Sequence, residues 1–219
     1  SVVFMFSGQG SQYVNMCKDL YEANKTFRSN VDSCFKILLD NHDLDLKQLI
    51  YPEITNDSSS EKLKQTEITQ PALFVIEYAL AKTFIDLGIV PNLMVGDSIG
   101  EYVAACIAGV MDLDSALKIV CKRGALMQKL EKGTMLSVTL SESELKEILP
   151  DDLDIAVINS PNLCVVSGAI EKIDEFENFL TTKEISSAFL HTSHAFHSQM
   201  MDPVLDEFKD LVASVTLSQ

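Results

Sequence analysis

The order of hydrophobic and polar positions divides the chain into two parts with different rhythms. In the first part, short apolar runs alternate with longer stretches of helical spacing. Val2 to Phe6 is apolar without a break, which favours a buried strand of a parallel sheet, and residues 93–95 form the next strand. The spacing predicts helices over 16–41, from about Thr69 to Leu87, over 101–110 and from Leu113 to about Lys132.

Turn-forming residues set the ends of these elements. The polar stretch 51–65 is rich in turn residues, which predicts a surface loop. Pro71 suits the first turn of the helix that begins near Thr69, and Gly88 and Pro91 end that helix. Because this helix is apolar on nearly all sides, we expect it to be largely buried.

From Gly133 the pattern changes to shorter elements. Strand, helix, strand, strand, helix and strand follow one another, which is the order of a ferredoxin-like unit. The expected fold class is therefore α/β, with a parallel-sheet core and an inserted ferredoxin-like subdomain (βαββαβ). The expected boundaries place residues 1–132 and 194–219 in the core and residues 133–193 in the subdomain.

Charge and cysteine content narrow the classes of partner. The formal net charge of -15 repels nucleic acid and anionic membranes, so we expect neither as a partner. No apolar run is long enough to span a bilayer. The five cysteines are scattered without a CxxC pair and the start is not signal-like, which predicts free thiols and a cytoplasmic location.

A Gly-x-Ser-x-Gly turn is the strongest chemical signal in the chain. Residues 94–100 read "MVGDSIG", with a predicted strand before them and a predicted helix after them. In that setting the serine projects from a sharp, strained turn, and Gly96 and Gly100 let strand and helix approach closely. The amides at the start of the helix then point toward Ser98, where an oxyanion would form. The alternative is a purely structural glycine-rich turn.

A nucleophilic serine needs a base, and histidine is the first candidate. His42 lies in a polar segment and is expected to be solvated, whereas His191, His194 and His197 fall within "HTSHAFHS". A metal site is the alternative reading of that spacing. His191 belongs to a predicted strand, so no single helix presents all three rings, and no Cys or carboxylate pattern completes a metal site. A general base for Ser98 from this group, without a metal, is the better interpretation.

Arg123 lies on or beside the apolar face of its predicted helix, because Val120 and Met127 are three and four positions away. A guanidinium there must be paired or must face a cavity. Two interpretations remain open at this point. One is a structural ion pair, and the other is a clamp for a substrate carboxylate, which the planar guanidinium suits.

At these residues the sequence resembles the malonyl-CoA:acyl-carrier-protein acyltransferase family, including acyltransferase domains of polyketide and fatty acid synthases. The motifs run in order along the whole chain: "GQGSQ" (8–12), "TQPALF" (69–74), "GDSIGE" (96–101), "RGALMQ" (123–128), "NSPNLCVVSG" (159–168) and "HAFHS" (194–198). The resemblance implies a hydrolase-like α/β core with an inserted ferredoxin-like subdomain, in agreement with the pattern above.

The resemblance also implies residue roles. Ser98 is the implied acylated nucleophile and His197 its base, while the amides of Gln9 and Ile99 form the implied oxyanion hole. Substrate-binding roles are implied for a second set of residues, in which Arg123 binds the malonyl carboxylate: Arg123, Gln70, His194 and Phe196. His194, Phe196 and Ile99 follow the pattern that the family associates with malonyl rather than methylmalonyl substrates.

Two features depart from the family pattern. Asp97 stands where the family normally has histidine, and a carboxylate beside the pocket would repel a malonyl group, unless it points aside. The chain also stops at "VTLSQ", where family domains continue with further strands and a segment that orients the catalytic histidine. We therefore expect the chain to be C-terminally incomplete.

The implied enzyme is a malonyl-CoA:ACP transacylase-like acyltransferase without a bound cofactor. It would take an acyl-CoA, with malonyl-CoA favoured, and pass the acyl group through an acyl-serine to the phosphopantetheine thiol of an acyl carrier protein. A larger synthase is a candidate parent. One alternative is an acyl hydrolase that clears carrier proteins, and another is a degenerate, non-catalytic domain used for docking.

Overall fold

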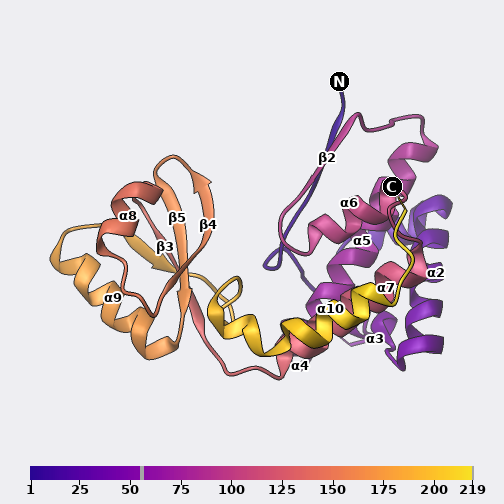
Figure 1. Cartoon of the computed structure of the whole chain (residues 1–219). Coiled ribbons are helices and arrows are strands. Elements are labelled where there is room, and N and C mark those ends of the chain that lie inside the picture. Colours follow the sequence, from indigo (N-terminus) through magenta and orange to yellow (C-terminus); the bar gives the residue numbers. More distant parts are fainter. Residues whose placement is uncertain (55–56, 219) are drawn as a thin grey trace. The chain divides into compact units, whose positions relative to one another are not determined.

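The computed structural model describes residues 1–54 and 57–218. The chain separates into two compact units, Ser1–Leu126 with Phe208–Gln219 and Met127–Glu207 (Figure 1). The elements of the first unit are β1 (Val3–Phe6), α1 (Lys18–Ala23), α2 (Lys25–His42), α3 (Leu46–Ile50), α4 (Asp57–Leu63), α5 (Thr66–Asp86), β2 (Leu93–Gly96), α6 (Gly100–Ile107), α7 (Leu113–Gln128) and α10 (Leu205–Ala213). The last two residues of α7 and the first three of α10 are counted with the second unit.

The two strands of the first unit pair in parallel, with a register that runs from Val3 opposite Leu93 to Phe6 opposite Gly96. The predicted parallel pairing is therefore confirmed. The predicted burial of Val2 to Phe6 is wrong for three of the five residues, Val2, Val3 and Met5, of which Met5 is 79% exposed, while Phe6 is 6% exposed. Helix α6 contacts both strands, and side chains alternate across a strand, so one face of the pair is packed and the other is open in the described chain.

Helix α5 forms the buried centre of the first unit, as its apolar pattern predicts: Phe74, Val75 and Ala79 are fully buried. It begins at Thr66 rather than near Thr69, so Pro71 lies inside the helix and not in its first turn. Backbone bonds to the carbonyl of Gln65 start the helix early. Its predicted end is confirmed.

The end of α5 shows why glycine is needed there. Gly88 has a φ of +83°, and its amide donates to the carbonyl of Ile85 at 2.9 Å. The amide of Ile89 donates to the carbonyl of Phe84, also at 2.9 Å. This pair of bonds is the Schellman arrangement, which requires a left-handed residue that glycine adopts without steric cost.

Three other boundary predictions are wrong. The expected loop over 51–65 contains α4, in which Leu63 is 2% exposed, while residues 55–56 of that stretch lie outside the described chain. The single helix expected over 16–41 is two helices, because Asn24 ends α1 and caps α2 by accepting from the amide of Phe27. Helix α7 ends at Gln128, not near Lys132, and Gly133 packs against Ala195 instead of ending the helix.

The second unit has the predicted βαββαβ order. Its elements are β3 (Thr134–Val138), α8 (Glu142–Ile148), β4 (Asp154–Ser160), β5 (Leu163–Gly168), α9 (Ile170–Thr182), β6 (Ser187–Phe189) and a 3₁₀ helix, η1 (Gln199–Val204). The strands form one antiparallel sheet in the order β4-β5-β3-β6, and α8 and α9 pack against it (Figure 1). The expected fold class, a parallel-sheet core with a ferredoxin-like subdomain, is confirmed.

Both faces of this sheet are covered, and this decides where the unit ends. Leu136 of β3 lies in the core cluster that contains Phe176 of α9. Met135, the preceding residue, packs in a separate cluster with Phe196 and Met201. The segment after β6 therefore belongs to this unit, which spans 127–207, whereas the sequence placed the boundaries at 133 and 193.

The loop from 190 to 198 is held tightly against the sheet. A Cβ on Gly133 would lie 2.6 Å from the Cβ of Ala195 and 2.8 Å from the carbonyl oxygen of Gly168, so only glycine permits this approach. His191, expected in a strand, lies after the end of β6 at Phe189 and is exposed. His194 is 1% exposed, and its Nδ1 lies 2.8 Å from Ser193 Oγ.

Burial lowers the pKa of His194, with the nearby charge of Lys132 acting in the same direction and the backbones of Leu130 and Gln128 acting against it. A histidine whose pKa is lower in the folded state than in the unfolded state favours the neutral ring. Its contribution to stability is present above the unfolded pKa of about 6.5 and is lost as pH falls toward the folded pKa.

We expect His194→Gln to flatten the pH dependence of stability. In urea titrations at pH 7.5 and 5.0, the drop in the free energy of unfolding should be smaller for the variant than for the wild type. The difference is bounded by one linked proton, at most about 1.4 kcal/mol per pH unit. His191→Gln, at an exposed ring, should keep the wild-type slope. Equal slopes for wild type and His194→Gln would contradict the assignment.

Candidate active site

Ser98 occupies a strained turn between β2 and α6. Its φ is +52°, in the left-handed region that is uncommon for residues other than glycine. Three backbone hydrogen bonds close the turn. The amide of Asp97 donates to the carbonyl of Phe6 at 2.9 Å, the amide of Gly100 to the carbonyl of Asp97 at 2.9 Å, and the amide of Glu101 to the carbonyl of Ser98 at 3.2 Å. Strain of this kind persists only where the surrounding structure over-determines it, which is typical of functional turns.

The flanking glycines are required by close backbone approach. A Cβ on Gly96 would lie 2.1 Å from the amide nitrogen of Glu101, and a Cβ on Gly100 would lie 2.5 Å from the carbonyl oxygen of Phe6. The Glu101 carboxylate also accepts from the amide of Gly96 at 2.8 Å. The strand, turn and helix expected around Ser98 are therefore present, with the glycines where the helix meets the strands.

Arg123 lies beside Ser98. Its Nη2 donates to Ser98 Oγ at 3.3 Å, and its guanidinium carbon lies 5.4 Å from the centroid of the Tyr102 ring. Burial lowers the pKa of Arg123, and Tyr102 opposes this effect. Among the described residues, none of the ion pairs involves Arg123, so the structural ion pair considered from the sequence is not the arrangement found.

The first turns of helix α5 contact the loop of Gln9 and the helix of Arg123. Gln70 is 2% exposed and lies one turn after Thr66, which is fully buried. The side chain of Gln9, in the loop after β1, donates from Nε2 to Thr66 Oγ1 at 3.5 Å. Gly124 permits α7 to approach this end of α5, because a Cβ there would lie 3.0 Å from the Thr66 carbonyl oxygen. The loop of Gln9 and the helix of Arg123 thus meet at the first turn of α5.

Two backbone amides in this unit are available for an anion. Ile99 is the N-cap residue of α6 and follows Ser98 directly. Within residues 1–54 and 57–218, no group accepts a hydrogen bond from the amide of Ile99 or of Gln9. The amides at the start of a helix carry partial positive charge and favour bound anions.

Asp97 is exposed and is directed toward the loop after β1. A Cβ on Gly8 would lie 2.8 Å from Asp97 Oδ2, so the carboxylate sits over the backbone of Gly8, next to Gln9. Glycine at position 8 leaves room for this side chain. The residue that departs from the family pattern therefore lies beside the loop of Gln9.

The three remaining predicted site residues belong to the second unit. His194 and Phe196 are buried, whereas His197 between Phe196 and Ser198 is exposed. The backbone of His197 has a φ of +58°, and Ser198 Oγ donates to the carbonyl of Ala195 at 2.7 Å. This tight turn buries its flanking residues and presents the His197 ring on the surface of its unit.

The cysteines do not compete with Ser98 as nucleophiles. All five lie in the described chain and are free. Burial raises the pKa of each thiol, to about 11 for Cys106 and about 12 for Cys121, so little thiolate exists at neutral pH. Among the residues that the structure describes, no group of three or more His, Cys, Asp or Glu is arranged to hold a metal ion.

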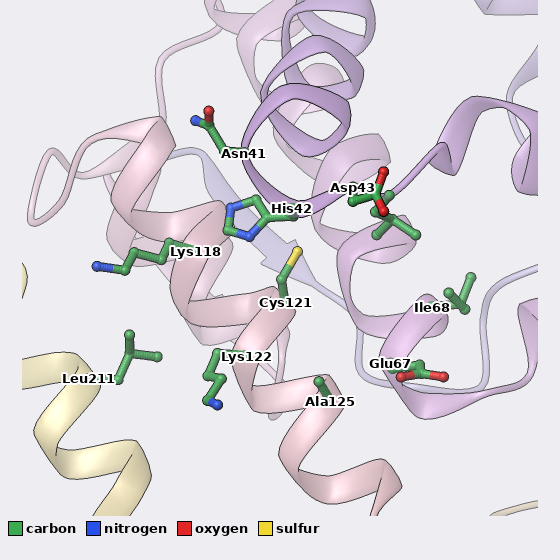
Figure 2. Close-up of a pocket in the computed structure, with 11 residues that line it drawn as sticks. Asn41, His42, Asp43, Glu67, Ile68, Lys118, Cys121, Lys122, Ala125 and Leu211 are labelled. Atoms are coloured by element: carbon green, nitrogen blue, oxygen red, sulfur yellow. The ribbon is translucent and has the colours of Figure 1, made fainter.

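The first unit also contains a pocket of about 640 Å³, and none of the predicted site residues line it (Figure 2). Lys118, Cys121, Lys122 and Ala125 share one face of α7 and line it. At about 100° per residue, Arg123 points away from that face. His42, expected to be solvated, is half-buried in this pocket, and burial lowers its pKa. The pocket is therefore not the site of Ser98.

Tyr102 is a site residue that the sequence analysis missed. Its ring faces the Arg123 guanidinium, and it also packs edge-on against Phe208 at 6.5 Å between centroids. The available signal was its position, since Tyr102 lies in the first turn of the predicted helix that follows Ser98. The geometry gathers a serine hydroxyl at a strained turn, a guanidinium and a helix N-terminus. These are parts suited to acyl transfer through a serine ester.

Comparison with solved structures agrees with this geometry. The acyl transferase domain of ZmaA has a TM-score of 0.92 at 43% identity, covering 99% of this chain and 51% of that one. The malonyl CoA-acyl carrier protein transacylase from Coxiella burnetii has a TM-score of 0.87 at 30% identity, covering 100% of this chain and 70% of that one.

Comparison with curated proteins gives the same result. A phenolphthiocerol/phthiocerol polyketide synthase of Mycobacterium tuberculosis is 36% identical over 212 residues, which are 97% of this chain and 14% of that protein. The chain thus spans a small part of such relatives and about half of the ZmaA domain. The family described as the acyl transferase domain matches residues 3–219. The resemblance stated from the motifs is confirmed, and the chain belongs to the acyl transferase domain family.

Proposed function

We propose that this chain is an acyltransferase that moves a malonyl-type group from coenzyme A to the phosphopantetheine thiol of an acyl carrier protein through an acyl-serine. The observation that carries the proposal is the contact of Arg123 Nη2 with Ser98 Oγ at 3.3 Å. It puts a half-buried cation, which has no carboxylate partner among the described residues, next to a hydroxyl on a strained turn. Similarity to a malonyl CoA-acyl carrier protein transacylase supports this choice of substrate and acceptor.

The proposed first half-reaction forms the acyl-serine. His197 accepts the proton of the Ser98 hydroxyl as the oxygen attacks the thioester carbonyl of the acyl-CoA. The amides of Gln9 and Ile99 donate to the resulting oxyanion. The C–S bond then breaks, and the leaving thiolate takes the proton from His197 as coenzyme A departs.

The second half-reaction transfers the group to the carrier protein. The phosphopantetheine thiol gives its proton to His197 and attacks the ester carbonyl, and Ser98 Oγ leaves and recovers that proton.

Substrate selection is assigned to the remaining residues. In this proposal, the Arg123 guanidinium binds the free carboxylate of the malonyl group through two parallel hydrogen bonds, with Tyr102 fixing the plane of the guanidinium. Gln70, His194 and Phe196 line the acyl pocket. The side chain of Asp97 stays at the edge of the site, over Gly8. No cofactor is required, because the thioester supplies the activated carbonyl.

Two other functions are less well supported. A hydrolase of simple acyl groups has no use for a cation beside the nucleophile. A degenerate docking domain has no need for the strained turn at Ser98, which costs of order 1–3 kcal/mol of backbone strain to maintain. Labelling with a serine-reactive phosphonate separates an inactive domain from both enzymes.

A carrier protein is itself acidic, and this chain has a net charge of -15. Docking of the carrier protein, within a larger synthase or to the domain alone, would therefore rely on a local basic patch.

Ser98→Ala is expected to abolish covalent acylation while leaving the fold intact, because only the Oγ is removed and the turn is built by Gly96 and Gly100. Intact-protein mass spectrometry after incubation with malonyl-CoA measures the gain of one acyl group.

His197→Ala should slow acylation by about 10²–10⁴-fold. His194→Ala should mainly change the choice of acyl group. Acylation that persists in Ser98→Ala would refute the nucleophile, and equal losses in the two histidine variants would refute His197 as the base.

Arg123→Ala is expected to lower the malonyl-to-acetyl preference at least about tenfold, because a charge-assisted contact is worth about 1.5–3 kcal/mol. The measurement is a pair of loading assays with malonyl-CoA and acetyl-CoA. The ratio is the readout, since Arg123 also contacts Ser98 and its loss changes both rates. Lys118→Ala, on the opposite face of α7, is the matched control. An unchanged ratio in Arg123→Ala would favour the hydrolase.

Asp97→His is expected to change malonyl loading only slightly. The carboxylate is exposed and sits over Gly8, and a surface charge acts through water with less than about 1 kcal/mol, which is within about fivefold in rate. The same loading assays measure this. A much larger gain in malonyl loading, with acetyl loading unchanged, would show that the Asp97 carboxylate faces the substrate carboxylate.

A further inference from the structure

A half-buried acidic residue on α5, Glu77, is connected to the loop that carries Gln9. Glu77 Oε1 accepts from the backbone amide of Ser7 at 2.8 Å and also accepts from the Ser7 hydroxyl in a short hydrogen bond. Ser7 directly follows β1, where the chain leaves the sheet. One carboxylate oxygen therefore accepts from both hydrogen-bond donors of Ser7, the first residue of the loop.

The network continues past Gln9. Ser7 Oγ lies 2.8 Å from Ser11 Oγ, and the Ser11 hydroxyl also lies within donating distance, 3.2 Å, of the carbonyl oxygen of Gly8. The amide of Gly10 donates to Gln12 Oε1 at 2.8 Å. The residues on both sides of Gln9 are thus tied to one another, while the Gln9 amide has no acceptor within the part of the chain that the structure describes.

Helix α5 holds this loop at two points. Gln9 Nε2 contacts Thr66 in the first turn of α5, and Ser7 contacts Glu77 three turns later. Thr66 is fully buried, and α5 is the buried centre of its unit. A loop without secondary structure of its own is in this way fixed to the most rigid element nearby. A preorganised oxyanion hole needs this, since its donors must not move as charge develops.

The position of the Glu77 carboxylate lowers the stability of the fold. Glu77 Oε2 is buried and has no hydrogen-bond partner among the described residues. Burial raises the pKa of Glu77, and the two donors from Ser7 oppose that shift. A buried polar atom without a partner destabilises the fold, so apolar packing alone would favour a side chain such as leucine here.

We propose that Glu77 is a positioning residue that holds the loop of residues 7–12 so that the Gln9 amide stays directed at the oxyanion. This inference rests on the proposed function. Glu77 touches neither the substrate nor Ser98 in this scheme and acts through Ser7 and Ser11. Its removal should therefore lower the rate constant for acylation of Ser98 with little effect on KM, because binding of the malonyl carboxylate depends on Arg123.

The test compares Glu77→Ala, which removes the acceptor, with Glu77→Gln, which keeps one acceptor oxygen. Removing one oxyanion donor costs about 10²–10³-fold in rate, so a misdirected donor should cost at least about tenfold. We expect Glu77→Ala to lose at least that factor in kcat for malonyl loading and Glu77→Gln to recover most of it. Glu67→Ala is the matched control, because Glu67 is an acidic residue of the same helix that faces the pocket in Figure 2.

Hydrogen exchange of the backbone amides supplies a readout that does not depend on activity. Amides of residues 8–11 should exchange faster in Glu77→Ala than in the wild type, and at the wild-type rate in Glu67→Ala. Ser7→Ala, which keeps the amide contact and removes the hydroxyl bridge to Ser11, should give a smaller effect of the same kind if Glu77→Ala does not fold.

The outcomes separate the two proposals. Unchanged loop exchange in the folded variants, or faster exchange with wild-type kcat, overturns the positioning role while leaving the acyltransferase intact. A loss that appears in KM rather than kcat also overturns it. Absence of Ser98 acylation in the wild type overturns the proposed function, and with it any catalytic role of the loop.

Discussion

The contact between Gly100 and the carbonyl of Phe6 is the constraint on which the rest of the site depends. With no Cβ at position 100, the first turn of α6 can lie against the end of β1, where any side chain would come within 2.5 Å of the Phe6 oxygen. This closeness leaves only a two-residue connection, Ser98 and Ile99, between Asp97 and the helix. Ser98 lies in this connection with a left-handed backbone, and Ile99, the N-cap residue of α6, follows it directly.

Helix α7 places a positive charge, the guanidinium of Arg123, beside the serine turn. Helix α7 approaches the first turn of α5 because Gly124 has no side chain, and this brings Arg123 next to Ser98 and Tyr102. An arginine without a carboxylate partner in such a place loses hydration that a ring face and a hydroxyl replace only in part. In the proposed function the substrate carboxylate takes the place of the acid with which a structural arginine would be expected to pair.

In the second unit, packing on both faces of the antiparallel sheet fixes the turn that contains His197. Its sheet is covered by α9 on one face and by the segment after β6 on the other, and Gly133 lets that segment approach the strands. Packing on both faces fixes the short turn in which His197 lies, although the ring itself is exposed. Packing on both faces of the sheet therefore holds the backbone of His197 firmly within its own unit.

The sequence by itself determined the βαββαβ order, the parallel pairing of the first two strands, the strained serine turn and the family, because these depend on local pattern and on glycines at fixed spacing. It misplaced features that depend on burial from outside the segment. Thr66, fully buried, starts α5 before the apolar run begins, and Leu63 holds a helix in a stretch that is polar by composition. Tertiary structure alone decided which partners the polar side chains found. Arg123 could have met a carboxylate but lies against Ser98 and Tyr102, and Glu77 reaches Ser7 across 70 residues of sequence, a contact that no local pattern encodes.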